Sequence, residues 1–116
     1  MAMVYCASSL ALAVLEILVH LPPAMRRAGA LPPMVAVGLE LPDGEVSQID
    51  GKGLDHRECR RHGDAWIAGR SSFAVRVPSF VIHLETNILL NPTHPGMSDV
   101  RLVVHDPFRF DDRLTP

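Results

Sequence analysis

Cysteine is scarce in this chain of 116 residues, with only Cys6 and Cys59 present. Two cysteines cannot form the network of disulfides that stabilises small secreted domains. We therefore expect two reduced thiols and a cytoplasmic protein. The chain also lacks a large excess of positive or negative charge, because its formal net charge is only −2. Nucleic acid and anionic membranes bind strongly basic surfaces, so neither is an expected partner.

Aromatic residues are few as well, with one tryptophan and one tyrosine, which draws attention to Trp66 and Tyr5. The sequence shows no internal repeat and no low-complexity segment. Its length suits a single domain that buries about two-thirds of its unfolded surface. The sequence therefore predicts one domain over residues 1–116.

The longest apolar run, Val4 to Leu21, is 18 residues, near the lower limit for a membrane span. It contains Glu16 and His20 and lacks the basic start and cleavage site of a signal peptide. We predict instead a short strand ending at Cys6 and a helix that Ser8 or Ser9 caps. A helix that is apolar all round is a buried helix, so Glu16 is expected in the interior or on a cleft wall.

A second unusual stretch runs from Val75 to Ile82, where Pro78 interrupts a predicted strand and Ser79 follows at once. Asn87 and Asn91 come next, and Asn91 begins a turn with Pro92. A buried strand does not need a serine and two asparagines to form a core. This stretch therefore indicates part of a functional site.

The remaining pattern predicts an α+β fold with a mixed, largely antiparallel sheet and one buried helix. Further strands, one of them mostly buried, and a charged helix are expected, with loops between them. The strands are 34–41, 100–105 and a short one at 108–110, the helix is 54–62, and the loops are 45–53 and 64–69.

These segments together resemble the RES domain, a family named for an arginine, a glutamate and a serine. The similar residues are spread over nearly the whole chain: 4–8, 13–16, 63–66, 77–79, Asn87, 90–92, 94–95 and 112–114. The resemblance implies a fold similar to that of ADP-ribosyltransferases. It also implies a toxin of a type II toxin–antitoxin system that degrades NAD by phosphorolysis or glycohydrolysis. The implied partners are NAD as substrate, inorganic phosphate and an Xre-type helix-turn-helix antitoxin, with no further cofactor.

The resemblance places the catalytic glutamate and serine at Glu16 and Ser79 and the NAD-binding tyrosine at Tyr5. Asn91, in a matching segment, is a further candidate for NAD binding. Each has a structural alternative. Glu16 could pair with His20 or with a core hydroxyl, and Ser79 could serve backbone groups beside Pro78. Tyr5 could end a strand in water, and Asn91 could stabilise its turn.

The family's arginine has no counterpart, because it belongs to a Gly-Arg-Trp-Asn-like segment upstream of the tyrosine. We therefore expect a domain truncated at its N-terminus. The alternative function is a catalytically inactive remnant that at most binds an antitoxin.

A metal site is the remaining possibility to weigh. His56, Cys59 and His62 are spaced three apart on a predicted helix, but no fourth ligand is evident. A solvated charged helix is the favoured interpretation.

Overall fold

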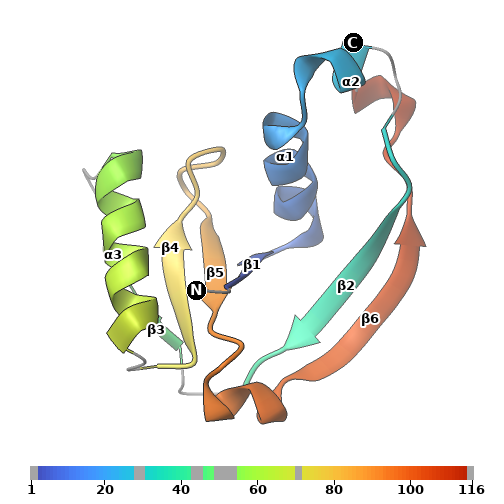
Figure 1. Ribbon diagram of the computed structural model, residues 1–116. Helices are drawn as coiled ribbons and strands as arrows, with labels where there is room; N and C mark the ends of the chain where they lie inside the picture. The colour runs from blue at the N-terminus through green and yellow to red at the C-terminus, as the bar shows by residue number, and fades with distance from the viewer. Residues whose placement is uncertain (1–2, 28–30, 43–45, 49–54, 70–71, 115–116) are drawn as a thin grey trace.

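The computed structural model describes residues 3–27, 31–42, 46–48, 55–69 and 72–114 (Figure 1). Strands and helices alternate irregularly along the chain, as expected for an α+β protein. The strands are β1 Val4–Ala7, β2 Met34–Glu40, β3 Val46–Gln48, β4 Ala74–Pro78, β5 Thr86–Leu90 and β6 Arg101–Phe108. The α-helices are α1 Leu10–His20, α2 Pro23–Arg27 and α3 His56–Gly69, and two short 3-10 helices are η1 Pro95–Asp99 and η2 Asp112–Leu114.

Four strands form the main sheet in the order β1-β5-β4-β3. The pairs β1/β5 and β5/β4 are antiparallel, and β3/β4 is parallel. The predicted mixed, largely antiparallel sheet is thus confirmed. Its core lies on both sides of β4 and β5. One cluster consists of Trp66, Ile67, Val75, Val77 and Leu89, and the other of Phe73, Ala74 and Leu90.

Helix α3 is longer than the sequence suggested, and the predicted loop 64–69 is wrong. The helix continues through Gly63 to Gly69. A glycine inside a helix costs about 1 kcal/mol relative to alanine, but here burial of Trp66 and Ile67 outweighs that cost. The indole Nε1 of Trp66 also donates to Ser72 Oγ at 2.7 Å. Tertiary packing therefore overrides a local signal to end the helix.

The predicted loop 45–53 also needs correction, because residues 46–48 form β3; Glu45 and residues 49–53 lie outside the described part of the chain. Val46 packs against the buried cluster around Phe73. Ser47 Oγ donates to the carbonyl of Ala74 at 3.3 Å. A strand this short has too few residues for an alternating pattern to reveal it.

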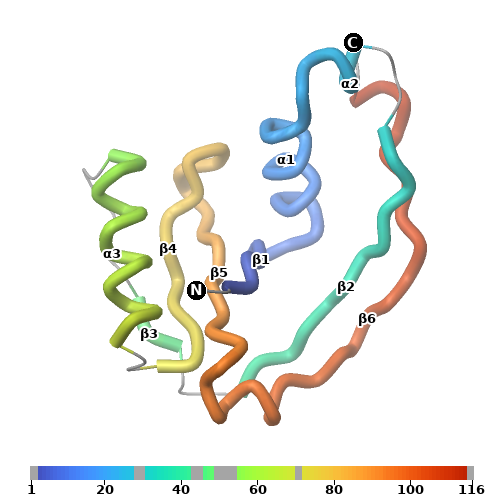
Figure 2. The backbone as a smooth tube through the Cα atoms, viewed as in Figure 1, coloured from blue at the N-terminus to red at the C-terminus, as the bar shows by residue number. Residues whose placement is uncertain are grey.

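Strands β2 and β6 pair with each other only and form a two-stranded ribbon (Figure 2). The predicted strands at 34–41 and 100–105 are confirmed. Strand β6 continues to Phe108, so the first residue of the short strand expected at 108–110 belongs to β6. The expected burial of β2 is wrong, since Val35 and Val37 are each 54% exposed. The end of the ribbon packs against the core of the main sheet through Leu39, but Val35 and Val37 line a hollow and are covered only in part.

At Gly38 the two strands of the ribbon lie too close together to leave room for a side chain. A Cβ atom added there would lie 2.9 Å from Val104 Cβ, next to the register shift between Gly38 and Leu39. We expect Gly38→Ala to lower the free energy of unfolding by about 1–3 kcal/mol, as overpacking does elsewhere. Gly69→Ala is the control, because nothing lies within 4 Å of the added methyl. Urea unfolding of both variants measures the difference, and equal midpoints would contradict the prediction.

Helix α1 follows the predicted bounds. The Ser9 side chain accepts a hydrogen bond from the backbone N–H of Leu12 at 3.1 Å, and the helix ends before Pro22. It is buried along one side only, through Leu12, Glu16 and Leu18, while Leu10 and Val19 are exposed. No helix in the described ranges is long and apolar enough to cross a bilayer.

Candidate active site

Three buried polar side chains from separate elements meet beneath α1. Glu16 comes from the middle of α1, Ser79 directly follows β4, and Asn87 lies on β5. The sheet register brings the two strands into line, because Asn87 is paired with Ala7 of β1 on one side and Val77 of β4 on the other. Glu16 is 9% exposed, Ser79 2% and Asn87 1%. Buried polar groups need partners, and Glu16 Oε1 accepts from the other two side chains, whereas Asn87 Oδ1 is buried without a partner among the described residues.

The Glu16 carboxylate is held by one of its two oxygens. Oε1 accepts hydrogen bonds from Ser79 Oγ and from Asn87 Nδ2, each at 2.8 Å. Within the described residues, Oε2 has no hydrogen-bond partner and is not among the fully buried atoms. Two donors on one oxygen fix the orientation of the carboxylate and leave the second oxygen available to a ligand.

Ser79 uses its whole hydrogen-bonding capacity inside the protein. Its Oγ donates to Glu16 and accepts from the backbone N–H groups of Val81 and Ile82, both at 3.1 Å. A hydroxyl has one donor and two acceptor sites, so none remains for a ligand. Ser79 therefore satisfies backbone groups after Pro78, as its structural alternative expected, and it also orients Glu16. A catalytic role for Ser79 stays a prediction.

Asn87 connects the buried carboxylate to Tyr5. Its Nδ2 donates to Tyr5 Oη at 2.7 Å as well as to Glu16. The opposite amide orientation would place two acceptors, Oδ1 and the carboxylate, against each other, so the contacts support this one. Because Tyr5 Oη accepts from Asn87, its own proton is free to point toward a ligand. Tyr5 is 60% exposed and is the member of the cluster that reaches the surface.

The pKa of Tyr5 is raised above its ordinary value of 10.0. Partial burial is the largest cause, the negative charge of Glu16 adds to it, and the hydrogen bond from Asn87 opposes both. The phenol is therefore neutral at physiological pH. Because the folded-state pKa is the higher one, the stability that Tyr5 contributes is present below pH 10.0 and is lost as the pH rises through the folded value.

This arrangement predicts a spectroscopic result. Tyr5 is the only tyrosine, so tyrosinate absorbance reports it alone. We expect a titration midpoint above 10.0 in the native protein and a lower midpoint in Glu16→Gln, which removes the neighbouring charge. The exposed Glu85 gives the control, and Glu85→Gln should leave the midpoint unchanged. Identical midpoints in all three proteins would contradict the electrostatic interaction between Tyr5 and Glu16.

The remaining candidates lie outside this cluster. His20 Nδ1 contacts the backbone carbonyl oxygen of Glu16 at 2.7 Å, so His20 pairs with the helix backbone rather than with the carboxylate. Asn91 Oδ1 accepts from the backbone N–H and the hydroxyl of Thr93, at 3.1 and 2.8 Å, which stabilises the turn. Asn91 Nδ2 is buried without a partner in the described structure. Binding of NAD by Asn91 stays a prediction.

Sequence reasoning gave Asn87 too little weight. The sequence pattern gave Asn87 no role of its own in the site, yet Asn87 lies on β5 between β1 and β4. The sequence feature that could have identified Asn87 as a site residue is its amide side chain, because every residue after it in β5 is apolar.

The histidine and cysteine spacing that was weighed as a metal site lies on α3. His56 stacks on Phe80, with ring centroids 3.8 Å apart. No group of three or more histidine, cysteine or acidic residues that could hold a metal occurs in the described ranges.

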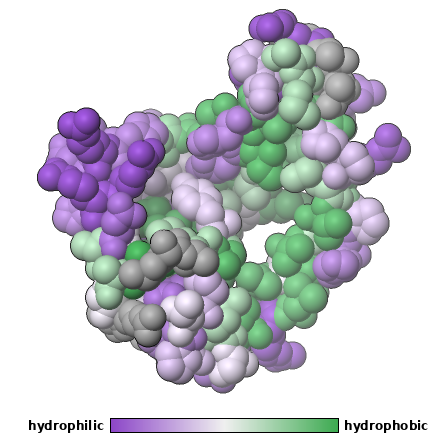
Figure 3. All heavy atoms as spheres, viewed as in Figure 1, coloured by the Kyte–Doolittle hydropathy of each residue, from purple (hydrophilic) through white to green (hydrophobic). Residues whose placement is uncertain are grey.

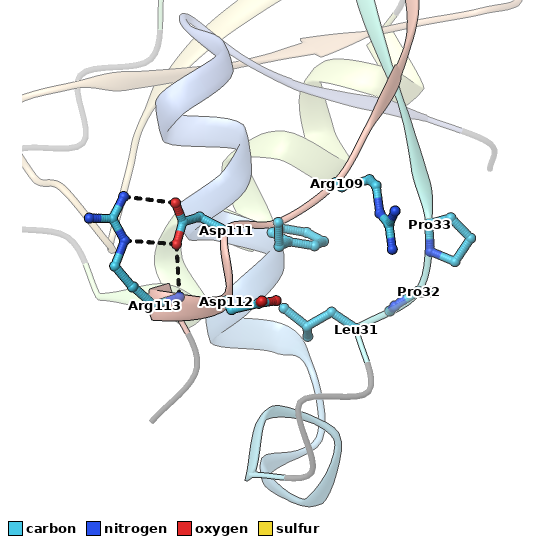
Figure 4. Close-up of a pocket in the computed structure, with 8 residues that line it drawn as sticks. Leu31, Pro32, Pro33, Arg109, Asp111, Asp112 and Arg113 are labelled. Atoms are coloured by element: carbon cyan, nitrogen blue, oxygen red, sulfur yellow. Dashed lines mark hydrogen bonds and ion pairs between the residues drawn. The ribbon is translucent and has the colours of Figure 1, made fainter.

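Two hollows in the surface share little with the cluster. One, of about 740 Å³, lies between residues 31–33 and 109–113, where Arg113 forms two hydrogen bonds with the carboxylate of Asp111 (Figure 4). The other, of about 530 Å³, lies between α1, β1 and the ribbon and includes Tyr5 but not Glu16. Tyr5 thus lines the apolar hollow and is joined to the buried carboxylate through Asn87.

Comparison with known proteins identifies the family of the chain. The sequence pattern of the RES domain matches residues 1–111. The chain is 31% identical over 125 residues to the Prs ADP-ribosylating toxin of Sphingobium sp. (strain YBL2), covering 97% of this chain and 74% of that protein. It is 33% identical over 124 residues to Toxin Res of Pseudomonas putida, and 29% identical over 122 residues to Toxin Res of Yersinia enterocolitica. These matches cover 96% and 97% of this chain, and 78% of each toxin. The chain belongs to the RES domain family.

Proposed function

We propose that this protein is a toxin that degrades NAD by cleaving the bond between nicotinamide and ribose. The observation that carries the proposal is the buried carboxylate of Glu16, fixed through Oε1 and free at Oε2. Relatives that are named as toxins, one of them an ADP-ribosylating toxin, support the same class of activity.

The chemistry needs little more than a fixed negative charge. As the C1′–N bond breaks, nicotinamide leaves as a neutral molecule with the bonding electron pair, so no acid has to protonate it. The ribose becomes an oxocarbenium-like cation, which the Glu16 carboxylate stabilises. Phosphate or water then attacks C1′, and a proton is released to solvent when water is the acceptor.

Tyr5 is placed to recognise the nicotinamide end of the substrate. Its exposed ring offers a stacking surface, and its hydroxyl proton is not used by Asn87. Tyr5 sits on β1, and Glu16 on the helix that follows, so the short link between these elements fixes one relative to the other. In this proposal Glu16 is the catalytic residue, Tyr5 binds substrate, and Ser79 and Asn87 position Glu16.

The test is incubation of the purified chain with NAD, followed by chromatography of the products. Nicotinamide with ADP-ribose indicates hydrolysis, and nicotinamide with a phosphorylated ADP-ribose that appears only when phosphate is present indicates phosphorolysis. Nicotinamide with ADP-ribose attached to protein indicates transfer. Expression should slow bacterial growth, and co-expression of an Xre-type antitoxin should restore it. Intact NAD after prolonged incubation would overturn the proposal.

One observation favours a second function, that of a catalytically inactive protein that binds an antitoxin. Among the described residues no arginine forms an ion pair or hydrogen bond with Glu16, Tyr5 or Asn87. Recognition of the NAD pyrophosphate usually uses arginine or a helix N-terminus. Stable binding of an Xre-type antitoxin without any loss of NAD would establish this second function.

A serine variant tests the division of roles. Ser79→Ala should reduce NAD turnover by about tenfold or less, because one neutral hydrogen bond contributes about 0.5–1.5 kcal/mol. It should also lower stability, since two backbone N–H groups lose their acceptor. Ser98→Ala is the control, as Ser98 is exposed and bonds only to Pro95. Turnover as low as in Glu16→Gln, with a covalent adduct trapped on the native serine, would show Ser79 to be a nucleophile.

A further inference from the structure

The first turn of α3 is firmly held at the edge of the main sheet. Asp55 caps it, because Asp55 Oδ1 accepts a hydrogen bond from the backbone N–H of Glu58 at 2.8 Å. Farther along the helix, Trp66 and Ile67 are buried in the core. The turn between β4 and β5 lies at the same end of the sheet as this first helical turn (Figure 1). His56, the first residue of α3, therefore stands on a fixed support beside the β4–β5 turn.

The β4–β5 turn, residues 79–85, is closed by its own backbone. The N–H of Ser79 donates to the carbonyl of Glu85 at 3.0 Å, and the N–H of Glu85 donates to the carbonyl of Ile82 at 2.9 Å. Ser79 Oγ accepts from the N–H groups of Val81 and Ile82. These bonds hold the turn together, and none of them reaches another element. The position of the turn therefore depends on side-chain contacts with the elements around it.

Phe80 provides such a contact and joins the turn to α3. Its ring stacks on the imidazole of His56, with centroids 3.8 Å apart and an interplanar angle of 23°. Within the described ranges, His56 is the one ring that Phe80 contacts. The surface over α3 is otherwise hydrophilic, and Phe80 remains 43% exposed (Figure 3). Because solvent still reaches much of Phe80, the stack contributes more to the placement of the turn than to the core.

Ser79 lies between this stack and the buried carboxylate. It precedes Phe80 directly, and its Oγ donates to Glu16 Oε1 at 2.8 Å. Movement of the turn therefore moves one of the two donors that orient Glu16. A carboxylate stabilises a developing cation best when its orientation is fixed before the reaction.

We infer that His56 is a positioning residue for the reaction. By stacking on Phe80 it fixes the β4–β5 turn, and through Ser79 it fixes the Glu16 carboxylate. The inference rests on the proposed function, because it takes Glu16 as the catalytic residue. The role needs a flat ring at position 56 and no proton transfer, so phenylalanine can take the place of this histidine.

Amide hydrogen exchange measured by NMR tests the anchoring without NAD. In His56→Ala and in Phe80→Ala, the N–H groups of Val81 and Ile82 should exchange about two- to tenfold faster than in the native protein. The double variant should match the single variants, since both changes remove the same contact. His56→Phe should restore native exchange. The control is His62→Ala, which changes an exposed histidine of the same helix and should leave exchange unaltered.

Initial rates of NAD cleavage test the link to Glu16. His56→Ala should lower kcat about two- to fivefold, less than the loss of the Ser79 hydroxyl itself, and should leave KM unchanged. KM is expected to stay because the stack is remote from Tyr5, which binds substrate in the proposed function. His56→Phe should restore kcat, and His62→Ala should match the native rate. Thermal unfolding of each variant confirms that the compared proteins are folded.

Three outcomes would overturn the inference. The first is native exchange at Val81 and Ile82 in His56→Ala. The second is equal effects of His56→Ala and His62→Ala, which would show a general change in α3. The third is faster exchange with unaltered kcat, which would separate the turn from catalysis. If the native chain leaves NAD intact, the proposed function fails, and the exchange rates alone then decide whether His56 anchors the turn.

Discussion

Glu16→Gln is expected to reduce nicotinamide release from NAD by roughly two to three powers of ten while the fold persists. Glutamine has the shape of glutamate, and its Oε1 can still accept from Ser79 and Asn87. It carries no charge, so it cannot stabilise the positive charge that develops on the ribose. A single electrostatic contact of this kind is worth about 3–4 kcal/mol in other enzymes.

The measurement is the initial rate of nicotinamide formation by the purified variant, with thermal unfolding to confirm that it is folded. The control is Glu85→Gln, which removes an exposed carboxylate from the turn between β4 and β5. That variant should match the native rate. Unchanged NAD consumption by folded Glu16→Gln would remove Glu16 from the catalytic role.

Local signals allowed the N-terminal half of the site to be predicted from sequence. Ser9 caps α1 and Pro22 ends it, because capping and proline geometry depend on a few neighbouring residues. Glu16 stood out because an ionisable side chain in an apolar helix needs a reason to be there. The family resemblance then assigned it a role.

Properties that depend on tertiary contacts were not predictable in this way. Gly63 is a helix-ending signal on its own, yet α3 passes through it because Trp66 and Ile67 bury against the sheet. The apolar sequence of β2 resembles a buried strand, yet the ribbon pairs only with itself. An apolar run shows that burial is favourable, and it does not show whether another element is present to provide it.

The link between Tyr5 and Glu16 also depends on tertiary contacts, so it was not predictable from local sequence. Asn87 joins them because the register puts it opposite Ala7, and register across a sheet is a long-range property. The sequence separations of its two contacts, 82 and 71 residues, show why no local pattern revealed them.

Asn87→Asp should be the most destabilising single change in this cluster. It replaces the Nδ2 donor with an oxygen that faces both Glu16 Oε1 and Tyr5 Oη. Two carboxylates in contact at a position only 1% exposed repel each other where water cannot screen them. Loss of a partner from a buried charge commonly costs about 3–5 kcal/mol, and we expect a decrease in the free energy of unfolding of that size near neutral pH.

The pH dependence distinguishes repulsion from a simple loss of packing. Two carboxylates in contact hold a shared proton more tightly in the folded state than in the unfolded chain, which raises the pKa of the pair. Stability therefore increases as the pH falls, and the deficit should shrink between about pH 8 and about pH 5. Asn91→Asp is the matched control: Asn91 is also 1% exposed, but its Oδ1 already accepts from Thr93 and its Nδ2 has no partner in the described structure. Urea unfolding across this pH range should give a smaller loss for Asn91→Asp than for Asn87→Asp. A deficit in Asn87→Asp that does not change with pH would mean that Asn87 does not hold the Glu16 carboxylate.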